Sequence, residues 1–110
     1  MCAQQNLWVK LKVFSENLQK RYGEIRIIVF GSTALGNRLK ESDIDILLVS
    51  DKFENIKYVN RSLVISNLWH KLFNENQLSL HLITLTEKEF EEMRDFVVVK
   101  QAMQEGIMLS

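Results

Sequence analysis

Two aspartates, Asp43 and Asp45, stand at the start of an apolar run that ends at Val49. Side chains two residues apart on a strand point the same way, so both carboxylates are expected on one face, with Ile44 and Ile46 on the other. Two carboxylates this close repel each other unless a cation lies between them. Because their oxygens suit Mg²⁺ or Mn²⁺, the pair indicates a divalent metal site.

A glycine and a serine, Gly31 and Ser32, follow the preceding apolar run, Ile27–Phe30. A turn of small residues exposes backbone N–H groups that bind phosphate. The start of a short helix, expected over Thr33–Arg38, would add a favourable dipole. A tight strand-to-helix turn with a serine cap is the structural alternative. In combination with the two aspartates, the pattern favours a metal-bound nucleotide.

The full pattern is Gly31-Ser32, ten intervening residues, and then Asp43-Ile44-Asp45. It resembles the signature of the polymerase-beta-like nucleotidyltransferase superfamily, and the chain is similar to the minimal nucleotidyltransferases. These are small prokaryotic proteins that are often paired with a HEPN-domain protein in toxin–antitoxin modules. The resemblance implies transfer of a nucleoside monophosphate, AMP from ATP, to a hydroxyl of a protein or RNA acceptor. It also implies Asp43 and Asp45 as catalytic ligands of Mg²⁺ (or Mn²⁺), and Gly31 and Ser32 as nucleotide-binding residues.

Two positions depart from the family pattern. Family members usually carry a third acidic residue on the later strand, and His81 occupies that place here. A neutral imidazole is a poor Mg²⁺ ligand but accepts a proton near pH 7. His81 is therefore a substitute catalytic base, a sign of weak activity, or a strand residue facing a partner. Leu35 stands where the family commonly has arginine, and Arg38 or Lys40 is the candidate for the missing charge at the nucleotide.

Composition sets the class of protein. At 110 residues the chain is expected to be one domain, residues 1–110, of ordinary globular composition, with 46% hydrophobic and 25% charged residues. Fourteen basic and fourteen acidic residues cancel, which argues against long duplex DNA as a partner. The single cysteine, Cys2, the lack of a signal-peptide pattern and the lack of a membrane-spanning run favour a reducing cytoplasm and no membrane.

Hydrophobic periodicity, turn residues and caps predict the elements. Helices are expected over Gln5–Tyr22 (capped by Gly23), Thr33–Arg38, Ile56–Phe73, a segment from Glu87 to a break near Asp95, and Val97–Glu105 (capped by Gly106). Strands are expected over Ile25–Phe30, Ser42–Val49, Leu78–Ile83 and Ile107–Leu109, with loops at Asp51–Asn55 and Asn74–Gln77. This order predicts an α+β fold, with a small mixed sheet and helices packed mainly on one face. The resemblance implies the same: the nucleotidyltransferase fold.

Polar side chains on the helix over Ile56–Phe73 receive no catalytic role. Lys57 and Arg61 are expected to form a solvated basic face, with contact to a triphosphate or a partner as the alternative. His70 is expected to be solvated.

Three hypotheses remain open. The chain is an active nucleotidyltransferase. Alternatively, it is a degenerate member of that family that acts as a partner-binding antitoxin. In the third hypothesis it is an unrelated α/β module in which Asp43 and Asp45 are solvated acids at the end of a strand.

Overall fold

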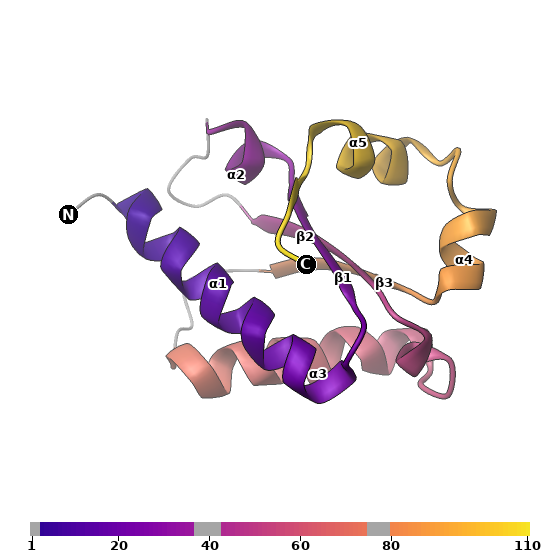
Figure 1. Cartoon of the computed structure of the whole chain (residues 1–110), viewed down its shortest axis with the longest axis horizontal. Helices are drawn as coiled ribbons and strands as arrows, with labels where there is room; N and C mark the ends of the chain where they lie inside the picture. The colour runs from indigo at the N-terminus through magenta and orange to yellow at the C-terminus, as the bar shows by residue number, and fades with distance from the viewer. Residues whose placement is uncertain (1–2, 37–42, 75–79) are drawn as a thin grey trace.

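A four-stranded mixed sheet forms the centre of the molecule (Figure 1). The computed structural model describes residues 3–36, 43–74 and 80–110. The strands are β1 (Arg26–Phe30), β2 (Ile44–Val49), β3 (Leu80–Leu85) and β4 (Ile107–Met108), in the spatial order β3-β2-β1-β4. Strand β1 is antiparallel to both β2 and β4, whereas β2 and β3 are parallel. The predicted α+β class with a mixed sheet is confirmed.

Helices cover both faces of this sheet (Figure 1). They are α1 (Ala3–Tyr22), α2 (Ser32–Leu35), α3 (Tyr58–Phe73), α4 (Glu87–Glu92) and α5 (Val97–Glu105), with a 3-10 turn η1 at Asp51–Phe53. The two long helices, α1 and α3, lie on one face, as expected, and the shorter α4 and α5 lie on the other. Because β2 and β3 are parallel, the chain needs the α3 crossover to return to the sheet.

Alternation along the strands divides the core in two. One core lies between the sheet and helices α1 and α3. It contains the α1 stripe Leu7, Leu11, Phe14 and Leu18, together with Ile44, Ile46 and Leu48 of β2. The side chains facing α4 and α5 include Phe30, Leu47, Val49, Phe90 and Val99. Both cores are buried, so a shift of β2 by one residue would exchange its two faces. The position of Asp45 on β2 is fixed in this way.

Two predicted boundaries are wrong. The short helix begins at Ser32 and ends at Leu35, before Arg38, because Gly36 adopts a left-handed conformation with φ of 78°. Strand β3 continues beyond Ile83 to Leu85, because its pairing with β2 runs on to Val49. Its predicted start at Leu78, and most of the predicted turn at 74–77, lie outside the described residues.

Several caps agree with the sequence. Gly23 follows α1 with φ of 72°, and its N–H donates to the carbonyl of Gln19 at 2.8 Å. The sequence Thr86-x-x-Glu89 predicts a capping box at the start of α4. The box is present, since the Thr86 hydroxyl accepts from the Glu89 N–H while the Glu89 carboxylate accepts from the Thr86 N–H. Gly106 ends α5 as expected, though in an extended conformation.

The second edge of the sheet is formed by β4, which has only two residues. Ile107 and Met108 are exposed. A short edge strand limits pairing with another sheet.

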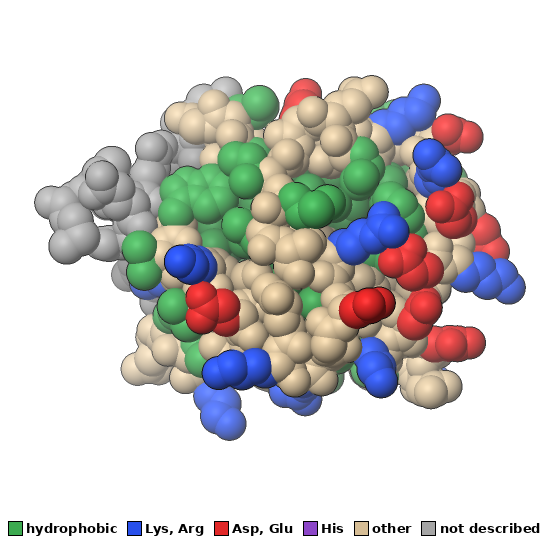
Figure 2. Space-filling view, in the orientation of Figure 1, with side chains coloured by type: hydrophobic (Ala, Val, Ile, Leu, Met, Phe, Trp, Pro, Cys, Tyr) green, Lys and Arg blue, Asp and Glu red, His purple; other side chains and the backbone are tan. Residues whose placement is uncertain are grey.

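On the face of the molecule shown in Figure 2, apolar side chains gather in a band above α1. Among the described residues, the helices are too short or too polar for any of them to cross a bilayer.

The expectation that Arg61 is solvated is wrong. Arg61 is 5% exposed, and its Nε donates to the Ile56 carbonyl at 2.9 Å. Its Nη1 donates to the Thr84 carbonyl at 3.1 Å and to Glu89 Oε1 at 2.6 Å. Arg61 therefore joins α3 to the end of β3 and the start of α4, and a paired, buried guanidinium is not free to bind phosphate. His70 is exposed, as expected.

The Arg61 guanidinium, as the main cause, lowers the pKa of the Glu89 carboxyl below its ordinary value of 4.5. Glu89→Gln should therefore reduce the free energy of unfolding at pH 7 by about 1 kcal/mol, a charge-assisted hydrogen bond discounted for partial exposure. A lowered folded-state pKa stabilises the fold fully above the unfolded value, and the contribution is lost as pH falls through the folded value. Urea unfolding at pH 7 and pH 3.5 should show the difference shrinking at the lower pH.

The matched control is Glu91→Gln, because Glu91 forms only an exposed i,i+3 pair with Arg94 at 3.3 Å. Its free energy of unfolding should change by less than about 0.5 kcal/mol. Equal effects of the two substitutions would contradict the structural role given to Glu89.

Candidate functional site

The predicted site residues meet where β1 ends and β2 begins. Phe30, the last residue of β1, pairs with Asp45 across the antiparallel ladder. Gly31 comes next in the chain and adopts φ of 70° and ψ of −151°. This conformation is rarely accessible to residues with a Cβ, so the turn out of β1 depends on glycine.

The Asp45 carboxylate lies directly against Gly31. A Cβ atom placed on Gly31 would overlap Asp45 Oδ2. Glycine at this position therefore serves two purposes, since it permits the left-handed turn and it leaves space for the carboxylate. Close approach of a backbone to a polar group is a recurrent use of glycine.

His81 lies beside Asp45 on the neighbouring strand. The two residues are partners in the parallel β2–β3 ladder, so their side chains share one face of the sheet. His81 Nδ1 and Asp45 Oδ1 are 2.8 Å apart, within hydrogen-bond distance. The side chains are 57% and 25% exposed, respectively, so the pair is open to solvent. His81 lies on the later strand, as expected, and the structure adds that it is paired with Asp45.

Asp43 precedes β2 by one residue and is exposed. Among the described residues, no three His, Cys, Asp or Glu side chains are already gathered around a common point. The donor chemistry nevertheless fits a divalent ion, because Asp45 offers carboxylate oxygen and Asp43 is close to it in the chain. Asp43 and Asp45 are thus the residues that would hold a metal.

The Gly31-Ser32 turn leads into a helix of only four residues. So short a helix adds little dipole, and any phosphate affinity must come from the backbone N–H groups and the hydroxyls of the turn. The N-cap position is Gly31, so the serine cap of the structural alternative is not formed. Thr33 is buried, and its hydroxyl has no hydrogen-bond partner among the residues that the structure describes. The sequence analysis gives Thr33 no role at the site, although Thr33 directly follows the Gly31-Ser32 turn and therefore lies next to the proposed phosphate site.

The position at which the family commonly has arginine is occupied by Leu35. Leu35 is 55% exposed and supplies no charge. Arg38 and Lys40, the predicted substitutes, lie outside the described residues. Arg61, the alternative phosphate contact, is buried at the far end of β3 in the ion pair with Glu89.

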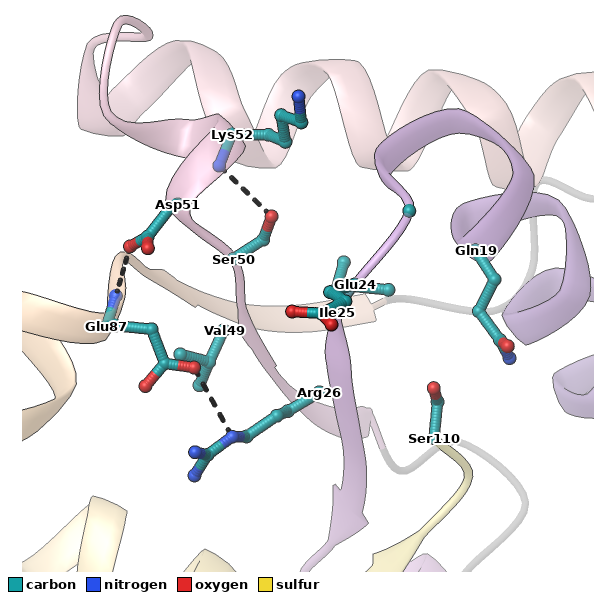
Figure 3. A pocket seen from close by; sticks show the side chains of 11 residues that line it. Gln19, Glu24, Ile25, Arg26, Val49, Ser50, Asp51, Lys52, Glu87 and Ser110 are labelled. Carbon is teal, nitrogen blue, oxygen red and sulfur yellow. Dashed lines mark hydrogen bonds and ion pairs between the residues drawn. The ribbon is translucent and has the colours of Figure 1, made fainter.

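A separate hollow of about 580 Å³ lies at the opposite end of β2, around Val49 (Figure 3). Two contacts join its lining residues: Arg26 pairs with Glu87 at 3.4 Å, and the backbone N–H of Glu87 donates to the Asp51 carboxylate at 3.1 Å. The residues with predicted chemistry lie at the other end of the strands, so this hollow is not the candidate site.

A mixed sheet that brings an Asp-Ile-Asp strand against a Gly-Ser turn defines the class of nucleotide-transferring domains. Residues 11–109 match the family model described as the nucleotidyltransferase domain. This chain belongs to that family, in the polymerase-beta-like superfamily, and the hypothesis of an unrelated module is excluded.

Known proteins agree with this assignment. The chain is 34% identical over 101 residues to the "putative protein adenylyltransferase MJ0604" of Methanocaldococcus jannaschii, covering 90% of this chain and 93% of that one. The crystal structure of a "putative nucleotidyltransferase" from Sulfolobus solfataricus superposes with a TM-score of 0.61 at 22% identity, covering 96% and 80% of the two chains. A second crystal structure of a "putative nucleotidyltransferase" gives a TM-score of 0.52 at 30% identity, covering 78% and 88%.

The contact between Gly31 and Asp45 yields a paired test. Gly31→Ala should destabilise the fold by about 2–4 kcal/mol, the strain of an alanine at φ of 70° and ψ of −151° plus the overlap with the carboxylate. Gly36→Ala is the control, since Gly36 has φ of 78° and an added Cβ would meet nothing within 4 Å. It should cost only about 1–2 kcal/mol. Thermal and urea unfolding measure both, and equal costs would contradict a close approach of Asp45 to Gly31.

Proposed function

We propose that this protein transfers AMP from ATP to a hydroxyl group of a protein acceptor, with a divalent ion held by Asp43 and Asp45. The observation that carries the proposal is the placement of the Asp45 carboxylate between Gly31 and His81, in a chain of the nucleotidyltransferase family. The name of the Methanocaldococcus jannaschii relative supports ATP as the donor and a protein as the acceptor. Residues 1–110 would act as one catalytic domain, in the cytoplasm.

The reaction exchanges one bond at phosphorus for another. The acceptor hydroxyl oxygen bonds to the α-phosphorus, and the bond from that phosphorus to the bridging oxygen breaks. Pyrophosphate leaves, and the proton of the hydroxyl passes to water. An ion of the kind that this family uses, Mg²⁺ or Mn²⁺, would neutralise phosphate charge and align the attacking and leaving oxygens.

The chain's own residues supply position and charge. Asp45 is held at the start of β2 by strand pairing and offers its carboxylate at the edge of the site. Backbone N–H groups after Gly31 and the Ser32 hydroxyl would hold the outgoing phosphates, because a turn without bulky side chains permits close approach. Arg38 is proposed as a further contact to the nucleotide. His81 is proposed as a catalytic residue because it contacts Asp45 directly.

The acceptor is proposed to be a partner protein, and the resemblance to minimal nucleotidyltransferases makes a HEPN-domain toxin the first candidate. Modification of the toxin by this chain would be the antitoxin function, and an RNA hydroxyl is the other acceptor class. His81 in place of an acidic residue is the observation that favours a second function: a catalytically degenerate antitoxin that only binds its partner.

Labelled transfer separates these functions. With ATP labelled at the α-phosphate, Mg²⁺ or Mn²⁺ and the neighbouring gene's product, label should enter the acceptor. Asp45→Asn should reduce the transfer rate at least about 100-fold, because one ligand carboxylate contributes several kcal/mol to the transition state. Asp51→Asn is the matched control, since Asp51 is an exposed aspartate at the opposite end of the same strand.

Transfer that persists in Asp45→Asn would overturn the proposed mechanism. A stable complex with the partner but no transfer under any of these conditions would instead support the degenerate antitoxin.

A further inference from the structure

We propose that His81 ligates the catalytic ion through Nδ1, beside Asp45 Oδ1, so that the site prefers a first-row transition ion to Mg²⁺. This inference rests on the proposed function, since it concerns the ion used there. It assigns to His81 one of the roles that an imidazole can play and explains why a residue that suits Mg²⁺ poorly occupies this position.

The distance between His81 Nδ1 and Asp45 Oδ1 is close to the distance between adjacent ligands of one ion. Two neighbouring ligands of an octahedral ion, each about 2.1 Å from it and at right angles, are separated by about 3 Å. The observed separation of His81 Nδ1 from Asp45 Oδ1 is 2.8 Å. The separation of these hydrogen-bonded atoms is close to that of adjacent ligands, so a rotation of the imidazole would direct both atoms toward one ion.

The second argument is position in the sheet. Asp45 and His81 are direct partners on parallel strands, and each extends from the same face. The His81 side chain is 57% exposed, so its ring has room to turn about its bonds and to admit an ion and water. Rotation of the side chains would therefore suffice, and the pairing of β2 with β3 would not have to change.

The third argument is electrostatic. A neutral imidazole carries one proton, and in the present contact Nδ1–H donates to the carboxylate. An ion bound at Asp45 Oδ1 would face that N–H at close range and repel it. If the proton moves to Nε2, the Nδ1 lone pair faces the ion instead, and the repulsive contact becomes a bond.

Ligation by His81 would change which divalent ion the site prefers. Carboxylate and water suit Mg²⁺, whereas an imidazole nitrogen favours transition ions, with affinity rising from Mn²⁺ to Co²⁺. A site with a carboxylate in this place has only oxygen ligands, so its preference for Co²⁺ over Mg²⁺ should be weaker than that of a site with an imidazole nitrogen. An opposite-charge cross-strand pair is the alternative explanation of the same contact, in which His81 never touches an ion.

Pulsed electron paramagnetic resonance of bound Mn²⁺ distinguishes these explanations. The full chain is prepared with ordinary and with ¹⁵N-labelled histidine, and the electron spin echo is recorded with Mn²⁺ and no nucleotide. A nitrogen bonded directly to Mn²⁺ modulates the echo, and the modulation should change with the ¹⁵N label. It should disappear in His81→Gln and persist in His70→Gln, a matched control because the chain has only these two histidines and His70 is exposed on α3.

Calorimetry supplies the second readout. The unmodified chain should bind Co²⁺ and Mn²⁺ more tightly than Mg²⁺, and His81→Asp should reduce the ratio of Co²⁺ to Mg²⁺ affinity by about tenfold or more. An unchanged ratio would overturn the inference. Circular dichroism should show that the variants fold, as expected for substitutions of an exposed side chain.

Failure of this inference is distinguishable from failure of the proposed function. Mn²⁺ that binds in an Asp45-dependent manner without histidine modulation overturns the role given to His81 and leaves the transferase proposal standing. Absence of any Mn²⁺ binding that is lost in Asp45→Asn overturns both.

Discussion

The contact between the Asp45 carboxylate and the backbone of Gly31 is the constraint on which the site depends. It requires a residue without a Cβ at the end of β1, and it requires β2 to pair with β1 in one register only. The register is fixed by two buried cores, because β2 presents Ile44, Ile46 and Leu48 to one and Leu47 and Val49 to the other. Burial on both faces of a strand thus positions a carboxylate that is itself partly exposed.

The crossover helix α3 and its contacts position β3, the strand that carries His81. Strands β2 and β3 are parallel, so the chain must cross the sheet through α3 before His81 can lie beside Asp45. Arg61 on α3 then binds the Thr84 carbonyl and Glu89, which fixes the far end of β3 and the start of α4. A buried guanidinium is costly unless it is paired, so this arrangement holds β3 in place only while its partners are present. Strand β3 in turn places His81 beside Asp45.

Local signals in the sequence were sufficient for most elements. The stripe from Leu7 to Leu18 predicted α1, and the Thr86–Glu89 box predicted the start of α4, because each depends on residues within a few positions of one another. Arg61 was misjudged because its partners Thr84 and Glu89 are distant in sequence, and helical spacing does not reveal them. The helix expected over Thr33–Arg38 is too long, because Gly36 is a left-handed cap that ends it at Leu35.

The site was predictable in its residue types and only partly in its geometry. The Asp-Ile-Asp pattern and the Gly-Ser pair identified the family, and strand position predicted His81 on the later strand. The pairing of His81 with Asp45 is known only from the structure. The overlap that any Cβ on Gly31 would make with Asp45 follows from the register of Phe30 with Asp45, which composition and periodicity do not specify. The unpaired hydroxyl of Thr33 likewise depends on how α2 packs.

The central claim is that a cation lies between the aspartates and a triphosphate held by the turn at Gly31 and Ser32. The most direct measurement is a crystal structure with Mn²⁺ and a non-hydrolysable ATP analogue, with the ion located by anomalous scattering. The account predicts an anomalous peak within bonding distance of Asp45, next to phosphate density at the Gly31-Ser32 turn. Nucleotide bound elsewhere, with no ion at Asp45, would contradict it.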